Sequence, residues 1–244
     1  MKLSLNPPPL EVFMLGIVDF KEVQQLQRRQ VYEVGEGAGA SLILCEHPPT
    51  ISVGREGSRA HIAADDDFLK SLGIGVHWVN RGSGCVLHLP GQLAAYLTLP
   101  LDAFGLTVQD YLDRLHEAIL GVLAEFTLVG TAQPQTGGVY LGEQRVASVG
   151  VAVNRWVAYH GLTLNVGPSL SLFHLLDEPG PFANRLRQTS MESRRQRTTP
   201  MAKVRESMIR NLEATFRIPS HHVYTSHPLV RRKVLSHAYA PSPG

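Results

Sequence analysis

The stretch 81–92, RGSGCVLHLPGQ, gathers several side chains that can do chemistry. It holds an arginine, a histidine, one of the two cysteines of the chain and three glycines. Small residues permit positive φ, so we expect successive N–H groups at 82–84 to converge on an anion or a carbonyl oxygen, with Arg81 adding a planar donor fork. A tight hairpin with a structural arginine is the alternative, because Gly-rich turns are common.

A second block, 137–166, has the same character. It reads GGVYLGEQRVASVGVAVNRWVAYHGLTLNV, with alternating apolar residues that predict strands on both sides of a turn. A corner of small residues, 148–150, follows the first apolar run. The pair His160 and Gly161 interrupts the second. Polar and small residues inside apolar strands indicate close approach of another group.

Together with the upstream segment CEHPPTISVGREG at 45–57, these blocks resemble the lipoyl(octanoyl) transferase family of the biotin/lipoate protein-ligase superfamily. The likeness extends to about residue 216. The matching residues are Arg81, Gly82, His88, Pro90, Gly91 and Gln92; Arg145, Val146, Ala147, Ser148, Val149 and Gly150; and His160, Gly161, Leu164, Asn165 and Val166. Four ordered motifs make the resemblance specific.

The resemblance implies an acyltransferase of lipoate biosynthesis that uses no cofactor. Such an enzyme moves an octanoyl group from acyl carrier protein to a lysine of the lipoyl domains of 2-oxo-acid dehydrogenases or of the glycine cleavage H protein. Three segments are then expected to meet in one acyl pocket. Their residues are Arg81, Gly82, Ser83, Gly84, Cys85, Val86, Leu87 and His88; Ser148, Val149 and Gly150; and Gly161, Leu162 and Thr163.

Two positions depart from the family pattern. The family's catalytic lysine falls on Arg145, and its catalytic cysteine, counted without gaps from His160, falls on Pro179. Arginine keeps the positive charge but does not titrate near neutrality, and proline offers no nucleophile. A small error in the count does not restore the thiol, because no cysteine occurs from residue 86 to residue 244.

Cys85 is the thiol that remains near the site. Loop amides and Arg81 would lower the pKa of its thiol, and His88 would act as its base. The alternative is that Cys85 packs as a small hydrophobic residue at a strand edge. Cys45 lies in an apolar strand and is interpreted as a reduced core residue.

Three functions remain open. The first is an octanoyltransferase that works through Cys85 or by direct acyl transfer. The second is a catalytically silent relative that binds an acyl group or a lipoyl domain, which the residues at 145 and 179 favour. The third is an ATP-using lipoate ligase, which is weaker because the chain has no distinct nucleotide motif.

Composition bounds the setting. With 244 residues, 43% of them hydrophobic, the chain fits one globular domain. It has no run of about 18 apolar residues, and prolines at 7–9 interrupt the amino terminus, so we expect a cytoplasmic protein without membrane or signal segments. The histidines lack metal-ligand spacing, and no metal is expected.

The charge is uneven along the chain. Residues 1–184 carry 11 basic and 18 acidic side chains, whereas residues 185–244 carry 12 basic and 3 acidic ones. The basic quarter is interpreted either as a solvated helix with a tail or as a surface that attracts an acidic partner. Nucleic acid is not expected, because no aromatic residues interleave with the arginines.

The order of elements predicts an α+β fold, with a mixed, mostly antiparallel sheet covered by helices. We expect helices at 19–35, 65–72, 107–126 and 199–216, and strands at 40–45, 51–53, 75–80 and 93–101, the last two as partners. Two or three further strands are expected in 139–166. The catalytic domain is expected at 1–217, followed by a low-order extension at 218–244.

Overall fold

The computed structural model describes residues 9–177 and 187–233 of the chain. Within these ranges an eight-stranded sheet has the order β11-β1-β2-β6-β10-β9-β8-β7. Strand β1 is parallel to its neighbours β2 and β11, and the other pairs are antiparallel. The sheet is therefore mixed and mostly antiparallel, as predicted. Its strands are β1 (Leu10–Ile17), β2 (Ser41–Glu46), β6 (Gln92–Pro100), β7 (Thr131–Gln133), β8 (Gly138–Leu141), β9 (Gln144–Asn154), β10 (Val157–Asn165) and β11 (His221–Tyr224).

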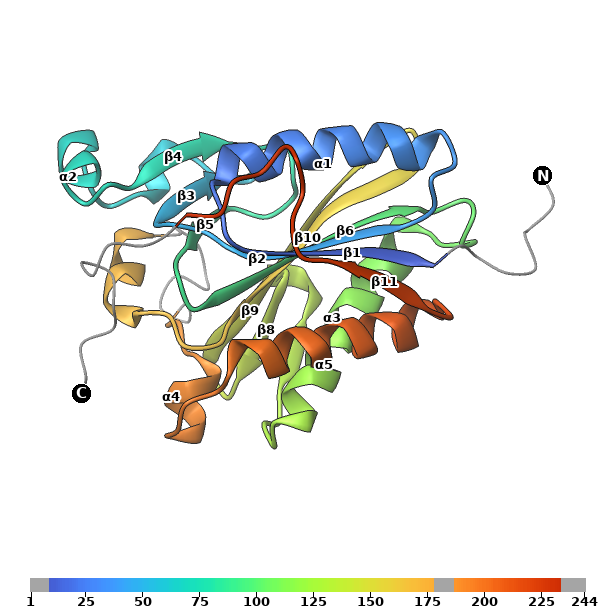
Figure 1. Ribbon diagram of the computed structural model, residues 1–244. Helices are drawn as coiled ribbons and strands as arrows, with labels where there is room; N and C mark the ends of the chain where they lie inside the picture. Colours follow the sequence, from blue (N-terminus) through green and yellow to red (C-terminus); the bar gives the residue numbers. More distant parts are fainter. Residues whose placement is uncertain (1–8, 178–186, 234–244) are drawn as a thin grey trace.

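A second sheet of three strands lies at one end of the first (Figure 1). Its central strand is β3 (Thr50–Val53), which pairs in parallel with β4 (Gly75–Trp78) and in antiparallel fashion with β5 (Cys85–His88). The prediction that 93–101 pairs with 75–80 is wrong. Strand β6 is buried along almost its whole length, and such a strand belongs in the middle of a covered sheet, here between β2 and β10.

Helices cover both faces of the large sheet (Figure 1). Helix α1 (Phe20–Gly35) lies on one face, and α3 (Val108–Glu125) and α5 (Met201–Phe216) lie on the other. Strand β2 shows the division: Leu42 and Leu44 pack in the cluster with α3 and α5, whereas Ile43 and Cys45 pack with α1. The shorter helices are α2 (Asp66–Ser71), α4 (Met191–Arg195) and the 3-10 turns η1 (Arg59–His61), η2 (Pro134–Thr136) and η3 (Leu170–Leu175).

The helix starts follow the capping signals in the sequence. Asp19 caps α1 by accepting from the Lys21 N–H at 2.9 Å. Thr107 and Asp110 form a reciprocal capping box at the start of α3. Pro200 lies at the N-cap of α5.

The segment after α5 corrects one expectation. Residues 218–233 were predicted to be a low-order extension, but β11 adds a strand to the edge of the large sheet beside β1. The Tyr224 ring stacks on Phe13 with centroids 5.0 Å apart, and Lys233 Nζ lies 2.7 Å from Asp19 Oδ2. The edge of β1 offers backbone N–H and C=O groups, and β11 pairs with them. All four side chains of β11 are exposed, so no hydrophobic alternation marks it in the sequence. Residues 234–244 lie outside the described part.

Candidate active site

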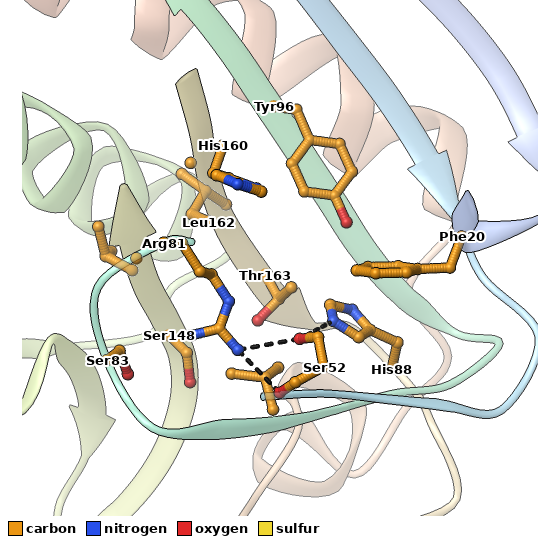
Figure 2. A pocket seen from close by; sticks show the side chains of 14 residues that line it. Phe20, Ser52, Arg81, Ser83, His88, Tyr96, Ser148, His160, Leu162 and Thr163 are labelled. Atoms are coloured by element: carbon orange, nitrogen blue, oxygen red, sulfur yellow. Dashed lines mark hydrogen bonds between the residues drawn. The ribbon is translucent and has the colours of Figure 1, made fainter. Parts of the chain in front are cut away.

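Residues from all three predicted segments line one cavity, which we call the first cavity (Figure 2). The empty space among them, which includes open solvent, is about 350 Å³. Strands β9 and β10 form its floor, and the 81–84 loop, β5, β3 and the start of α1 form its walls. Its residues are Phe20, Ser52, Arg81, Ser83, Val86, His88, Tyr96, Ser148, Val149, Gly150, His160, Gly161, Leu162 and Thr163.

Two glycines, paired across β9 and β10, make the floor possible. A Cβ atom at Gly150 would lie 2.8 Å from the Gly82 carbonyl oxygen and 3.1 Å from the Arg81 Cδ. A Cβ atom at Gly161 would lie 2.3 Å from the Ala95 carbonyl oxygen on β6. Real Cβ atoms do not approach other atoms so closely. These motif glycines therefore allow the loop and the neighbouring strand to approach the floor.

The loop itself differs from the expectation. The positive φ falls on Ser83, at 70°, and not on Gly82 or Gly84. The Gly82 N–H donates to the Val151 carbonyl at 2.8 Å, and the Ser83 N–H donates to Glu56 Oε1 at 3.1 Å. The prediction that these amides converge on a ligand is wrong, because they already fasten the loop to β9 and to the turn after β3.

Arg81 fixes the polar wall of the first cavity. The side chain is buried, and its Nη2 donates to the Ser52 carbonyl at 3.0 Å and to Ser52 Oγ at 2.9 Å. Ser52 Oγ also forms a hydrogen bond with His88 Nε2, 2.8 Å away (Figure 2). His88 Nδ1 has no hydrogen-bond partner among the described residues.

The histidines around this wall are neutral near pH 7. Burial holds the pKa of His88 well below its ordinary value, and the charges of His47 and Arg81 add to the effect. Burial, opposed only in part by the hydrogen bond to the Val18 carbonyl, lowers the pKa of His47 to about 4. Burial and then the Arg81 charge lower the pKa of His160 to about 3.

Each of the other two histidines is held by a polar partner. His47 Nδ1 donates to the Val18 carbonyl at 2.9 Å, so its Nε2 accepts from the Tyr96 hydroxyl, also at 2.9 Å. His160 Nε2 donates to Asn80 Oδ1 at 3.3 Å. Within residues 9–177 and 187–233, no cluster of three or more potential ligands is placed to hold a metal ion.

A second cavity adjoins the first and shares Val86, Ser148 and Thr163 with it. Both candidate catalytic side chains that the structure describes, Cys85 and Arg145, line this second cavity. Its empty space is about 280 Å³. The remaining lining residues are Leu87, Gln92, Ala147, Asn165, Phe173, Leu176 and Gln188.

Cys85 faces away from the first cavity. In the β3–β5 pair it lies opposite Val53, whereas Ser52 lies opposite Val86 on the other face of the small sheet. The Cys85 side chain packs with Val53 and Leu87 in the small core, and its thiol donates to the Ser58 carbonyl at 3.6 Å. The prediction that His88 acts as its base is wrong. The two residues are three positions apart on β5, so their side chains point to opposite faces of the sheet.

Arg145 is buried beneath the edge of the large sheet. Its Nε and Nη2 donate to the Tyr140 hydroxyl at 3.2 and 3.1 Å, and its Nη2 also lies 3.3 Å from the Thr136 carbonyl. The guanidinium is thus oriented by β8 and the turn before it. Pro179, which the sequence resemblance places at the family's cysteine position, lies outside the described residues.

Cys45 is part of the core, as predicted. Its side chain is fully buried between the sheet and α1, and burial raises the pKa of the thiol far above its ordinary value. Its sulfur lies 3.6 Å from His47 Nε2. This thiol therefore stays protonated at neutral pH.

Other motif residues are structural links. Gln92 Nε2 donates to Asn165 Oδ1 at 2.7 Å, which ties the PGQ turn to the LNV strand. Asn165 Nδ2 donates to the Thr189 carbonyl at 2.9 Å. Glu46, from the EHPP segment, accepts from the Gly91 N–H at 2.8 Å and pairs with Arg205 of α5 at 2.7 Å.

Sequence reasoning missed three residues of the first cavity: Phe20, Ser52 and Tyr96. Phe20 was interpreted only as a core position of a helix, and Ser52 and Tyr96 as parts of apolar strands. A polar residue in each of two apolar runs was the available signal. His160, which with Gly161 was interpreted as a sign of close approach by another group, also lines the cavity.

The chain matches a domain family by sequence and shares its fold with solved lipoate protein ligases. The family model for the lipoyl protein ligase A/B catalytic domain matches residues 19–213. A putative lipoate protein ligase from T. acidophilum, solved with bound lipoic acid, is similar over 91% of each chain with a TM-score of 0.73 and 16% identity. A lipoate-protein ligase A bound with ATP is similar with a TM-score of 0.68 over 91% of this chain and 90% of that one.

Sequence relatives are more specific. An octanoyltransferase of Syntrophobacter fumaroxidans is 38% identical over 68% of this chain and 73% of its own length. One of Chloroflexus aggregans is 35% identical over 85% of this chain and 95% of its own length. The chain belongs to the octanoyltransferase family within the lipoyl protein ligase A/B catalytic domains.

Proposed function

We propose that this protein is an octanoyltransferase that moves an octanoyl group from an acyl carrier protein to a lysine of a lipoyl domain. One observation carries the proposal. In a chain of the octanoyltransferase family, three segments far apart in sequence meet at one cavity with family motif residues among its lining. The carrier and the lipoyl-domain acceptor come from the function of the family.

The acyl chain lies in the first cavity. Val86, Val149 and Leu162 supply apolar contacts there, and burial of each methylene group contributes about 0.8 kcal/mol. The histidines nearest to it, His47, His88 and His160, are neutral near pH 7. The Arg81 guanidinium donates to Ser52 and Gly82. An uncharged alkyl chain therefore displaces no ionic contact that this wall makes.

The thioester carbonyl lies where the first and second cavities meet, beside Ser148 and Thr163. This position brings it toward Arg145 and Cys85, which both line the second cavity. The Arg145 guanidinium stabilises the negative charge that develops on the carbonyl oxygen, as fixed donors do in acyl transfer. It donates and does not exchange protons.

Transfer through Cys85 is the covalent route. The Cys85 sulfur attacks the carbonyl carbon, the bond from that carbon to the carrier sulfur breaks, and the thiol proton ends on the released carrier thiol. The lysine amine of the acceptor then attacks the new thioester, forms the amide, and returns a proton to Cys85. In the direct route, the amine attacks the carrier thioester and its proton goes to the carrier thiol.

The experiment is acyl transfer in three purified components: this protein, octanoyl carrier and a lipoyl domain. Intact mass of the lipoyl domain should increase by one octanoyl group. If the route is covalent, Cys85→Ser abolishes both the adduct on this protein and the transfer, whereas Cys45→Ser keeps both. Transfer that persists in Cys85→Ser selects the direct route. No transfer and no adduct with wild type selects the catalytically silent relative and overturns the proposal.

A further inference from the structure

The far end of the first cavity is closed by one aromatic ring. Phe20, the first residue of α1, is buried and lines the first cavity, and it also lines a third cavity on the other side. Figure 2 shows the ring beside His88, on the opposite side of the drawn residues from Ser83 and Ser148. Phe20 thus separates the two spaces.

The three cavities follow one another along β10. Asn165 and Thr163 line the second cavity, the residues from Thr163 back to His160 line the first, and Tyr159 lines the third. Arg145 therefore marks one end of the series, and the third cavity lies at the other. An acyl chain whose carbonyl lies near Arg145 points its methyl end toward Phe20.

Neighbouring rings hold the Phe20 ring in place. It lies 5.0 Å from His88, 5.2 Å from His47 and 5.6 Å from His77, measured between ring centroids. The His160–Asn80 hydrogen bond continues the partition, because His160 lines the first cavity while Asn80 lines the third. The wall is therefore rigid, and Phe20 is its apolar part.

The third cavity is an open groove between α1 and the segment after β4. Its empty space, continuous in part with solvent, is about 930 Å³. The exposed Trp78 and the aliphatic stems of Lys21 and Arg28 form its sides. There is room beyond Phe20 for the end of a longer chain.

We propose that Phe20 sets the upper limit of acyl chain length, as the end wall of the acyl cavity. This inference rests on the proposed octanoyl transfer. Replacement by a smaller residue joins the first cavity to the third, so that the methyl end of a decanoyl or dodecanoyl chain passes the wall. A decanoyl chain has two more methylene groups to bury than an octanoyl chain. The expected gain in kcat/KM for decanoyl relative to octanoyl is therefore about tenfold.

The test measures kcat/KM for hexanoyl, octanoyl, decanoyl and dodecanoyl carriers with wild type, Phe20→Ala and Phe20→Leu. The ratio of decanoyl to octanoyl should rise about tenfold in Phe20→Ala and less in Phe20→Leu. Phe68→Ala is the matched control, since Phe68 is a half-exposed residue of α2 outside all three cavities. It should keep the wild-type ratio.

A folded Phe20→Ala or Phe20→Leu protein with the wild-type chain-length profile overturns the proposal. If Phe20→Ala does not fold, the milder Phe20→Leu decides, because it keeps most of the apolar volume. Failure of the proposed function gives a different result, since wild type would then transfer none of the four chains.

Discussion

The first and second cavities share three residues but differ in how closely they match the octanoyltransferase family. The first keeps Arg81, His88, Gly150 and Gly161 in a fixed arrangement of hydrogen bonds and close backbone contacts. The second holds Arg145, which the sequence resemblance places at the family's lysine position, and the same resemblance places Pro179 at the family's cysteine position. Features that hold an acyl chain and features that transfer it can therefore change separately.

Removal of Arg145 should have the largest effect, because it takes the remaining charge from the second cavity. We expect Arg145→Ala to lower kcat of octanoyl transfer by about 100- to 1000-fold, the usual loss for one oxyanion donor. Arg145→Lys, the residue that the sequence resemblance gives for this position, should retain most of the rate. Unfolding in urea must accompany the kinetics. A folded Arg145→Ala protein with wild-type kcat would exclude a role in transfer.

Removal of Arg81 breaks the wall of the first cavity. Arg81→Ala deletes hydrogen bonds from a buried charged donor to Ser52 and Gly82, and we expect the free energy of unfolding to fall by about 3 kcal/mol. Arg55→Ala removes an exposed side chain from the turn after β3 and keeps the backbone N–H that donates to the Arg81 carbonyl, so it should change the free energy of unfolding by less than about 0.5 kcal/mol. Equal stability of the two variants would contradict the assignment of Arg81 to the wall.

Acid should lower the free energy of unfolding of the protein, because two histidines at or beside the first cavity are buried and neutral. The folded-state pKa values of His47 and His160, about 4 and 3, lie below the ordinary 6.5. Between these values the unfolded chain binds more protons, so the free energy of unfolding falls with pH by about 1.4 kcal/mol per unit for each histidine. Stability is full above about pH 6.5 and is lost progressively toward pH 4.

Urea unfolding at pH 7, 6 and 5 checks this dependence. His160→Gln removes one of these two histidines and should reduce the change in the free energy of unfolding per pH unit by up to about 1.4 kcal/mol. A slope that His160→Gln leaves unchanged would mean that His160 is charged in the folded protein.

The smallest expected effect is on the rate of association with an acidic carrier or lipoyl domain. It involves residues outside both cavities. Arg195, Arg197 and Lys203 line a groove on the surface between α3 and α5. If their charge steers the carrier or the lipoyl domain, association should slow several-fold as the Debye length falls from about 10 Å at 0.1 M salt to about 3 Å at 1 M. Stopped-flow mixing measures the rate. A rate independent of salt would leave these residues as solvated surface.

Much of the fold follows from local patterns. The caps at Asp19 and Thr107 mark the two long helices that they begin, and apolar alternation marks β9 and β10. Strand β11 was missed because its side chains are all exposed and its stability comes from backbone pairing with β1. The partner of β6 was predicted wrongly as the strand at 75–80. Which strands pair depends on contacts between residues distant in sequence, and local patterns do not reveal them.

The candidate site was predictable where motif residues have fixed spacing, and less so where side-chain direction matters. The three motif segments do meet at one cavity. The relation of Cys85 to His88 depended on the strand at 85–88, which was interpreted as a loop. Once β5 is known, alternation places the two side chains on opposite faces. Phe20 joined the site only through the packing of α1 against the small sheet.

The most direct test of the acyl cavity is a crystal structure of this protein with octanoate. The account predicts an alkyl chain that runs along β10 between Val149 and Leu162, with its carboxylate beside Ser148 and Thr163 and its methyl end against Phe20. A chain bound in the third cavity, or one running with its carboxylate toward Phe20, would contradict it.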